Sequence, residues 1–185
     1  SLLKDIKCPP IHTHPDWPVN FRGVTLKDPG CPLYGLGFAE ELNVIPSPIQ
    51  YRVKLALSGV RPISNVVDVT NYVMLLFGQP LHAFDFDKLP APEITVRSSR
   101  AGERIVTLDG KEHELSEGDL LITSGGMPIG LAGVMGGANS EIDATTRRIL
   151  IESAHFLPPR ISTTARRLGI NSEAAYRYAR GVDKA

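Results

Sequence analysis

The sequence predicts an α+β fold, because its helical and strand-like segments occur in separate runs. Helical patterns occupy residues 47–78, strand-like patterns follow between residues 94 and 153, and two more helical patterns end the chain. A parallel α/β sheet would instead need strands and helices that alternate regularly. The 185 residues are 42% hydrophobic, which is enough for a sizeable core.

Residues 1–19 differ in character from residues 20–185. They contain four prolines and no clean period, which indicates a linker or an irregular start. His12 and His14 lie in this segment, and without a third ligand nearby we expect them to be exposed linker residues. Residues 20–185 are predicted to form one compact unit of two fused lobes.

Capping residues and apolar periodicity predict the first two helices. Ser47 can cap the first, with Pro48 in its first turn. Ser64 or Asn65 can cap the second, and Gly78 can end it. We expect the apolar residues that recur at helical spacing to face the core, namely Ile49, Val53 and Leu57 in the first helix and Val66, Val69, Val73 and Leu76 in the second. Asp68, Thr70 and Asn71 interrupt the second pattern and lie either exposed on its far face or at the rim of a pocket.

Strands are expected where the period changes to two or where short apolar runs occur. Asp109 and Gly110 predict a hairpin turn, because they tolerate positive φ values. Residues 147–153 include a continuous apolar run, which is typical of a strand buried on both faces. The other expected strands lie at residues 21–26, 34–39, 94–96, 120–124 and 127–133.

Two helices are predicted at the end of the chain. The first opens at Pro158, runs through Arg167 and ends at Gly169. Ser172 can cap the second, and Gly181 can end it.

Charge is balanced over the whole chain, with 20 Lys and Arg against 20 Asp and Glu. Residues 147–182 nevertheless hold seven arginines and two glutamates, a net charge of +5. Such a segment can bind a phosphate backbone. Solvated helix faces explain it as well, and the charge alone favours that simpler explanation.

Cysteine usage indicates a reducing compartment. Cys8 and Cys31 are too few for a disulfide framework, and no C-x-x-C metal pair occurs. No signal peptide is expected at the N-terminus, and no stretch reaches the ~18 apolar residues of a membrane span. We therefore expect a cytoplasmic protein.

Three places have residue types that chemistry uses. Gly133, Gly136 and Gly137 allow a ligand to approach the backbone closely, but the lysine of a phosphate-binding loop is missing, so a binding loop and a bare turn both remain open. His82 follows a helix stop, and a lone histidine is more often structural than catalytic. No Ser-His-Asp order, HExxH motif or acid pair is identifiable.

Glu152 ends a buried apolar run, where an unpaired carboxylate is costly. An ion pair with Arg61 or Arg148 would be a structural explanation. A carboxylate that binds a ligand hydroxyl in a pocket would be a functional one. His155 follows by three residues and is either its partner or a packing residue.

Four runs resemble the B3/B4 region of the β subunit of bacterial phenylalanyl-tRNA synthetase. They are RPISNVVDVTNYVMLLFGQPLHAFD, AGVMGGANSEI, ILIESAHF and ARRLGINSEAAYRYARGVD, in the order and spacing of that family, and they cover about residues 28–183. The resemblance implies a three-layer α+β fold that contains a β-sandwich flanked by helices. The three class II catalytic motifs are absent, and in that family they belong to the α subunit.

The family's B3/B4 region carries an editing site that hydrolyses Tyr-tRNA(Phe). The resemblance therefore implies an editing hydrolase domain that supports aminoacylation of phenylalanine tRNA. Its partners would be the 3′ end of tRNA(Phe) and the α subunit, in a heterotetramer of two α and two β subunits. No cofactor or metal is implied in this domain, because ATP and Mg act at the α-subunit site.

Site residues follow from the same motifs. Glu152 matches the family residue that binds the tyrosine hydroxyl. The pocket around it would be lined by Gly133, Gly136, Gly137, Ser172 and Ala174. His82, Thr70 and Asn71 match residues around the ester and are the expected catalytic group, and Arg61 would bind the tRNA end.

Two other functions remain open. The domain could be a non-catalytic tRNA-binding scaffold of the synthetase, or a free-standing deacylase that acts in trans. A scaffold would bind free tyrosine and phenylalanine equally, whereas an editing domain would prefer tyrosine.

Overall fold

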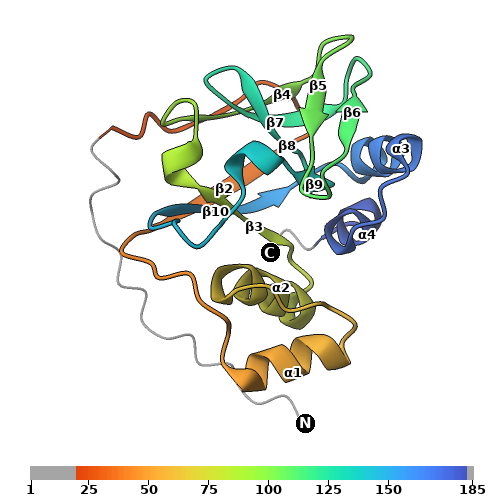
Figure 1. Cartoon of the computed structure of the whole chain (residues 1–185). Coiled ribbons are helices and arrows are strands. Elements are labelled where there is room, and N and C mark those ends of the chain that lie inside the picture. Colours follow the sequence, from red (N-terminus) through yellow and green to blue (C-terminus); the bar gives the residue numbers. More distant parts are fainter. Residues whose placement is uncertain (1–19, 183–185) are drawn as a thin grey trace.

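Two packed β-sheets with helices on two sides make up the computed structural model, which describes residues 20–182 (Figure 1). The five-stranded sheet has the order β1-β4-β7-β8-β9. Its strands are β1 (Val24–Leu26), β4 (Ile94–Ser98), β7 (Leu120–Ser124), β8 (Met127–Leu131) and β9 (Met135–Gly136). The three-stranded sheet has the order β2-β10-β3, with β2 at Leu33–Ala39, β10 at Ile149–His155 and β3 at Leu81–Asp85. A separate hairpin pairs β5 (Arg104–Val106) with β6 (Glu112–Glu114).

The helices lie in two pairs. The first pair is α1 (Ile49–Leu57) and α2 (Asn65–Phe77), and the second is α3 (Pro158–Leu168) and α4 (Glu173–Arg180). Short 3₁₀ turns occur at Phe86–Lys88 and Ala138–Ser140. The first pair, the three-stranded sheet and the five-stranded sheet follow one another as layers, and the second pair packs beside the sheets (Figure 1). The predicted α+β sandwich flanked by helices is therefore confirmed.

The main core lies between the two sheets. Phe84 and Leu150 from the three-stranded sheet share one buried cluster with Ile122 and Leu131 from the five-stranded sheet. Burying a large apolar side chain contributes roughly 1.5–3 kcal/mol. The α3–α4 pair joins this cluster, so the three-stranded sheet is held firmly on the face that carries Glu152.

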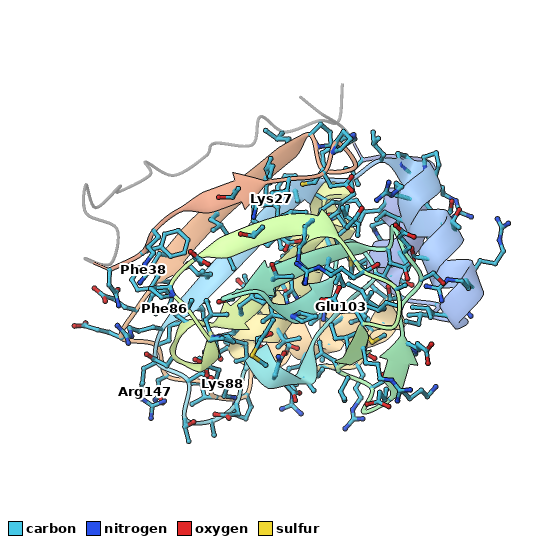
Figure 2. All side chains as sticks on the ribbon, turned by 90° about the horizontal axis from the view of Figure 1, so that it is seen from above. Lys27, Phe38, Phe86, Lys88, Glu103 and Arg147 are labelled. Carbon is cyan, nitrogen blue, oxygen red and sulfur yellow. The ribbon has the colours of Figure 1, made fainter. Side chains whose placement is uncertain are left out.

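Aromatic side chains close one edge of the sandwich. Phe38 on β2 and Phe86 after β3 meet edge to face, with ring centroids 5.5 Å apart, and Figure 2 shows both at the same edge. The Arg148 guanidinium lies over the Phe86 ring at 5.1 Å from its centroid. Its guanidinium also pairs with Asp87, so Arg148 stabilises this edge and is not available to Glu152.

The predicted buried face of α1 is wrong. Ile49, Val53 and Leu57 are 69%, 47% and 84% exposed, and Leu55 is the buried residue of the helix. The helix meets α2 through a different face, with the rings of Tyr51 and Tyr72 edge to face at 5.3 Å. Periodicity shows which residues share a face, but it does not show which face meets the protein.

The expected stripe on α2 is wrong in part for the same reason. Val69 and Leu76 are exposed, whereas Asp68 and Thr70 are buried. The Asp68 carboxylate accepts hydrogen bonds from the Ser47 hydroxyl at 2.6 Å and from the Ile63 amide at 2.7 Å. Ser47 therefore anchors the helix pair and does not cap α1, whose N-cap position is Pro48.

Local signals at the other helix ends are confirmed. Ser64 caps α2 by accepting from the Val67 amide, and Gly78 ends it in the left-handed conformation. Ser172 accepts from the Ala175 amide at 3.0 Å at the start of α4, and Gly169 ends α3 with φ +66°. Each of these depends on contacts within a few residues of chain.

The predicted hairpin is present with a longer turn. The strands β5 and β6 are joined by residues 107–111, and Gly110 has the positive φ of 76°. Asp109 does not share that conformation, and its side chain accepts a hydrogen bond from the Thr107 hydroxyl at 2.6 Å. The expected two-residue turn is therefore corrected to a five-residue loop.

Much of the basic C-terminal charge is neutralised by acids from earlier in the chain. Arg160 pairs with Asp28 at 3.0 Å, and Arg167 pairs with Asp119. Both acids are at least nine-tenths buried. Part of the charge of residues 147–182 therefore fixes α3 to the sheets, which weakens it as a sign of nucleic-acid binding.

Candidate functional site

Glu152 lies in the central strand of the three-stranded sheet. In the antiparallel register it is opposite Leu36 on β2 and His82 on β3. Side chains of directly paired residues point to the same face of a sheet. The pairing therefore places the Glu152 carboxyl and the His82 imidazole next to each other, on the face that meets the five-stranded sheet.

The Glu152 carboxyl is buried, with 4% of the residue exposed. The Tyr34 hydroxyl donates a hydrogen bond to its Oε2 atom at 2.7 Å. Neither arginine expected from the sequence pairs with it, because Arg148 pairs with Asp87 and Arg61 is exposed. The ion-pair explanation for Glu152 is therefore wrong.

Burial dominates the electrostatics of Glu152. It raises the pKa of the carboxyl to about 7, and the hydrogen bond from Tyr34 opposes part of that rise. His155 does not contribute, because it lies three positions from Glu152 on β10, and successive residues of a strand point to opposite faces. His155 is 5% exposed, and its Nδ1 atom has no hydrogen-bond partner. The packing explanation for His155 is thus confirmed.

A small cavity opens beside the carboxyl. Its volume is about 60 Å³. Glu152 and His82 contribute its ionisable groups, together with the Tyr178 hydroxyl. The remaining lining is mostly apolar or glycine and includes Phe84, Ile122, Gly130, Leu131, Gly133, Val134, Met135, Gly136 and Ala174.

Two glycines of the predicted loop shape this cavity. A Cβ atom on Gly136 would lie 2.6 Å from Nε2 of His82, so the absence of a side chain makes room for the imidazole. Gly133 has φ +66°, and a Cβ there would lie 2.9 Å from the Phe156 ring. Gly137 lies outside the lining; a Cβ there would meet the Ile129 carbonyl oxygen at 2.7 Å.

His82 lies between this cavity and a second one. The second cavity, of about 180 Å³, is also lined by Thr70, with Ile63, Val67, Ala83, Leu108, Glu141 and Ile142. Burial lowers the pKa of His82 to about 4, so the imidazole is neutral near pH 7. A neutral imidazole has one nitrogen that can accept a hydrogen bond from water.

The structure brings together six of the ten predicted site residues. Glu152, His82, Gly133, Gly136 and Ala174 line the first cavity, and Thr70 lines the second. Ser172 stands behind the wall, where its hydroxyl donates to the Val134 carbonyl at 2.6 Å. Asn71, Gly137 and Arg61 line neither cavity.

Sequence reasoning missed Tyr34 and Tyr178. Tyr34 lies opposite Ala154, which is two positions from Glu152 on β10. The proximity of Tyr34 to Glu152 can therefore be inferred only when the β2–β10 register is known. The Tyr178 hydroxyl donates to the carbonyls of Pro80 and Ala154. It therefore ties α4 to the same sheet.

Other kinds of site were also sought. Within residues 20–182, no three His, Cys, Asp or Glu side chains come together as a metal site requires, and His12 and His14 lie outside the described residues. No helix in this part of the chain has the length and apolar character needed to cross a membrane.

The sandwich, its helix pairs and the cavity at Glu152 define a domain of the B3/4 type. The family model described as "B3/4 domain" matches residues 30–185, and the chain belongs to this family. Among curated proteins, it is 51% identical over 154 residues to the phenylalanine–tRNA ligase beta subunit of Oleidesulfovibrio alaskensis and 53% identical over 154 residues to that of Nitratidesulfovibrio vulgaris.

Both alignments cover 83% of this chain and 19% of the relative, so the chain spans about a fifth of the length of these proteins. Among solved structures, an N-terminal fragment of the phenylalanyl-tRNA synthetase beta subunit from Pyrococcus horikoshii matches with a TM-score of 0.50 at 16% identity. That match covers 83% of this chain and 51% of the fragment, and it supports the fold alone.

Proposed function

We propose that this domain hydrolyses the ester that links tyrosine to tRNA(Phe), as the editing part of a phenylalanyl-tRNA synthetase. The observation that supports this most strongly is the buried Glu152 carboxyl beside a small, mostly apolar cavity. An apolar pocket suits an aromatic ring, and a single buried acceptor suits one hydroxyl on that ring.

The proposed selectivity follows from the cost of an unpaired buried polar group. A tyrosine ring in the cavity donates its phenol hydrogen to Glu152. A phenylalanine ring displaces water and leaves the Oε1 atom of the carboxyl without a donor, which costs roughly 1–3 kcal/mol. Sites built to hydrogen-bond a hydroxyl reject the analogue that lacks it far better than apolar pockets reject an added hydroxyl. A synthetic site for phenylalanine is an apolar pocket, so it rejects the added hydroxyl of tyrosine poorly. This cavity has a buried acceptor, so it can reject phenylalanine, which lacks the hydroxyl.

Hydrolysis needs a water molecule placed at the ester carbon. His82 is suited to orient it, because its neutral imidazole lies at the junction of the two cavities. The water oxygen forms a bond to the ester carbon, the bond to the ribose oxygen breaks, and the proton passes to that ribose oxygen. The products are free tyrosine and uncharged tRNA(Phe), and water is the only co-reactant.

Thr70 and Arg61 are the proposed contacts to the tRNA end. Thr70 faces the second cavity, where its hydroxyl donates to the Val67 carbonyl at 2.8 Å and keeps its lone pairs for a ligand. Arg61 is exposed before α2 and makes no ion pair with another described residue. Asn71 is half-buried beside Thr70, and we keep it in the group around the ester that the resemblance implies.

The partners are proposed from the relatives. Their name, beta subunit, supports an α subunit as the partner that holds the aminoacylation site with ATP and Mg. The editing reaction itself uses water, so we propose that this domain needs no cofactor.

Release of tyrosine from Tyr-tRNA(Phe) tests the proposal. Wild-type protein should deacylate Tyr-tRNA(Phe) much faster than Phe-tRNA(Phe), and Glu152→Ala should remove most of that difference. The assay should use the chain and the complete synthetase side by side. Binding of tRNA by both without release of tyrosine would favour a scaffold instead.

A further inference from the structure

Tyr34 is the one group within residues 20–182 that donates a hydrogen bond to the Glu152 carboxyl. It lies on β2 opposite Ala154, so its side chain shares the sheet face of Glu152. Its hydroxyl donates to Oε2 at 2.7 Å. The hydroxyl lies deep in the protein, and burial raises the pKa of Tyr34 well above its ordinary value, so it is a permanent donor.

The second oxygen of Glu152 is left for a ligand. No hydrogen bond joins Oε1 to any described residue, and Glu152 contributes to the lining of the cavity. A carboxylate with two free oxygens could turn and accept from a phenol, a water or an amide in several directions. Once Tyr34 holds Oε2, the carboxyl can no longer turn freely, and Oε1 is the oxygen without a donor among the described residues.

We infer that Tyr34 is a positioning residue that determines specificity, because its hydroxyl fixes the orientation of the Glu152 carboxylate and leaves Oε1 to accept the phenol of a bound tyrosine. This inference rests on the proposed editing function. Tyr34 itself does not line the cavity, so it acts on the substrate only through Glu152.

The groups around the Glu152 carboxyl leave Tyr34 as the main influence that favours its ionised form. The titratable groups near it are Tyr34 and Cys31 from the β2 side, His82 on β3 and Tyr178 on α4. Burial raises the pKa of Cys31 to about 12 and lowers that of His82 to about 4, so all of these groups are neutral near pH 7. The Tyr34 hydroxyl is therefore the main group that favours the ionised form of Glu152.

Calorimetric binding of free L-tyrosine and L-phenylalanine to the whole chain tests this inference between pH 6 and 9. Tyr34→Phe removes one oxygen and keeps the ring. We expect the ratio of tyrosine to phenylalanine affinity to fall about tenfold, as expected for a lost hydrogen bond to a charged group. The ratio should also fall as the pH decreases, because protonation of Glu152 removes the carboxylate. Without the Tyr34 hydroxyl the neutral carboxyl is favoured, so we expect the pH at which the ratio has fallen by half to move upward.

Two further variants separate positioning from packing. In a Glu152→Gln background, Tyr34→Phe should leave the ratio unchanged, because there is no carboxylate to hold. Tyr34→3,5-difluorotyrosine keeps the shape and makes the hydroxyl a better donor, so the pH midpoint should move downward. Tyr51→Phe removes the hydroxyl of a half-buried tyrosine on α1 that lines neither cavity, and should not shift that midpoint.

The outcomes are distinguishable. A wild-type preference for tyrosine that depends on Glu152 but survives Tyr34→Phe at every pH would overturn this inference alone. Loss of the preference by Tyr34→Phe to the same degree in the Glu152→Gln background would also overturn it. Equal binding of both amino acids by wild-type chain and Glu152→Gln would overturn the proposed function and the inference with it.

Discussion

Glu152 and His82 face each other across neighbouring strands, although 70 positions separate them in the sequence. Antiparallel pairing of β10 with β3 puts an acid of raised pKa and an imidazole of lowered pKa at one cavity. Both shifts have burial as their main cause, and burial favours the neutral form of each group. His82 is therefore uncharged beside Glu152, and the two groups place no fixed positive charge at the cavity.

Removal of the Glu152 charge should change the pH dependence of stability. The folded carboxyl has a pKa of about 7, against an ordinary value of 4.5 for a glutamate. The folded state therefore keeps a proton that the unfolded chain loses, and stability falls as pH rises from 4.5 through 7. Relative to Glu152→Gln, wild type should lose up to about 3 kcal/mol across this window. Urea unfolding at several pH values measures the difference, and parallel curves for the two proteins would contradict the assigned pKa.

Gly136→Ala should impair the site through His82. The new methyl would lie 2.6 Å from Nε2, so the imidazole has to move. Misplacement of a catalytic group by about 1 Å can cost roughly 10²-fold in rate. Deacylation of Tyr-tRNA(Phe) should fall by about that factor. Gly37→Ala on β2, where the nearest atom to the new methyl is 3.9 Å away, is the matched control and should leave the rate near wild type.

The exposed face of α1 gives a stability test. Leu55→Ala should lower the free energy of unfolding by about 2–5 kcal/mol, because Leu55 is 0% exposed. Leu57→Ala should change it by less than about 0.5 kcal/mol, because Leu57 is 84% exposed. Denaturant titration of both variants checks this. A large effect at Leu57 with none at Leu55 would mean that the helix is turned the other way.

The ion pair of Arg167 with Asp119 should hold α3 in place. Asp119 is 6% exposed and also accepts from the Thr164 hydroxyl at 2.7 Å. Asp119→Ala leaves these donors unpaired, and we expect a loss of about 3 kcal/mol. Glu112→Ala breaks an exposed pair with Arg104 and should cost less than about 1 kcal/mol. Thermal unfolding compares them, and equal shifts in Tm would contradict the distinction.

Features that depend on nearby residues could be predicted from the sequence. Ser64, Gly78 and Gly169 end or begin helices through contacts within one turn, and all three were placed correctly. The strand at residues 149–155 follows from its apolar run. The α+β order likewise follows from segment periods alone.

Features that depend on pairing between distant segments could not be predicted from the sequence. Tyr34 and Glu152 are 118 residues apart, and their contact follows from the β2–β10 register. The strand β3 was not expected, because LHAFD lacks a clear alternating pattern. On α2, the buried Asp68 is explained by Ser47 and Ile63, partners that no helical period reveals. The Glu152 and His82 assignments came from the resemblance, and the structure supplies their common cavity.

A crystal structure of the chain with bound L-tyrosine tests the central claim most directly. We expect the ring in the cavity between β10 and the Gly133–Gly136 segment, with the phenol oxygen about 2.7 Å from Oε1 of Glu152 and the carboxyl end toward His82. Tyrosine bound with its hydroxyl turned away from Glu152, or bound outside this cavity, would contradict it.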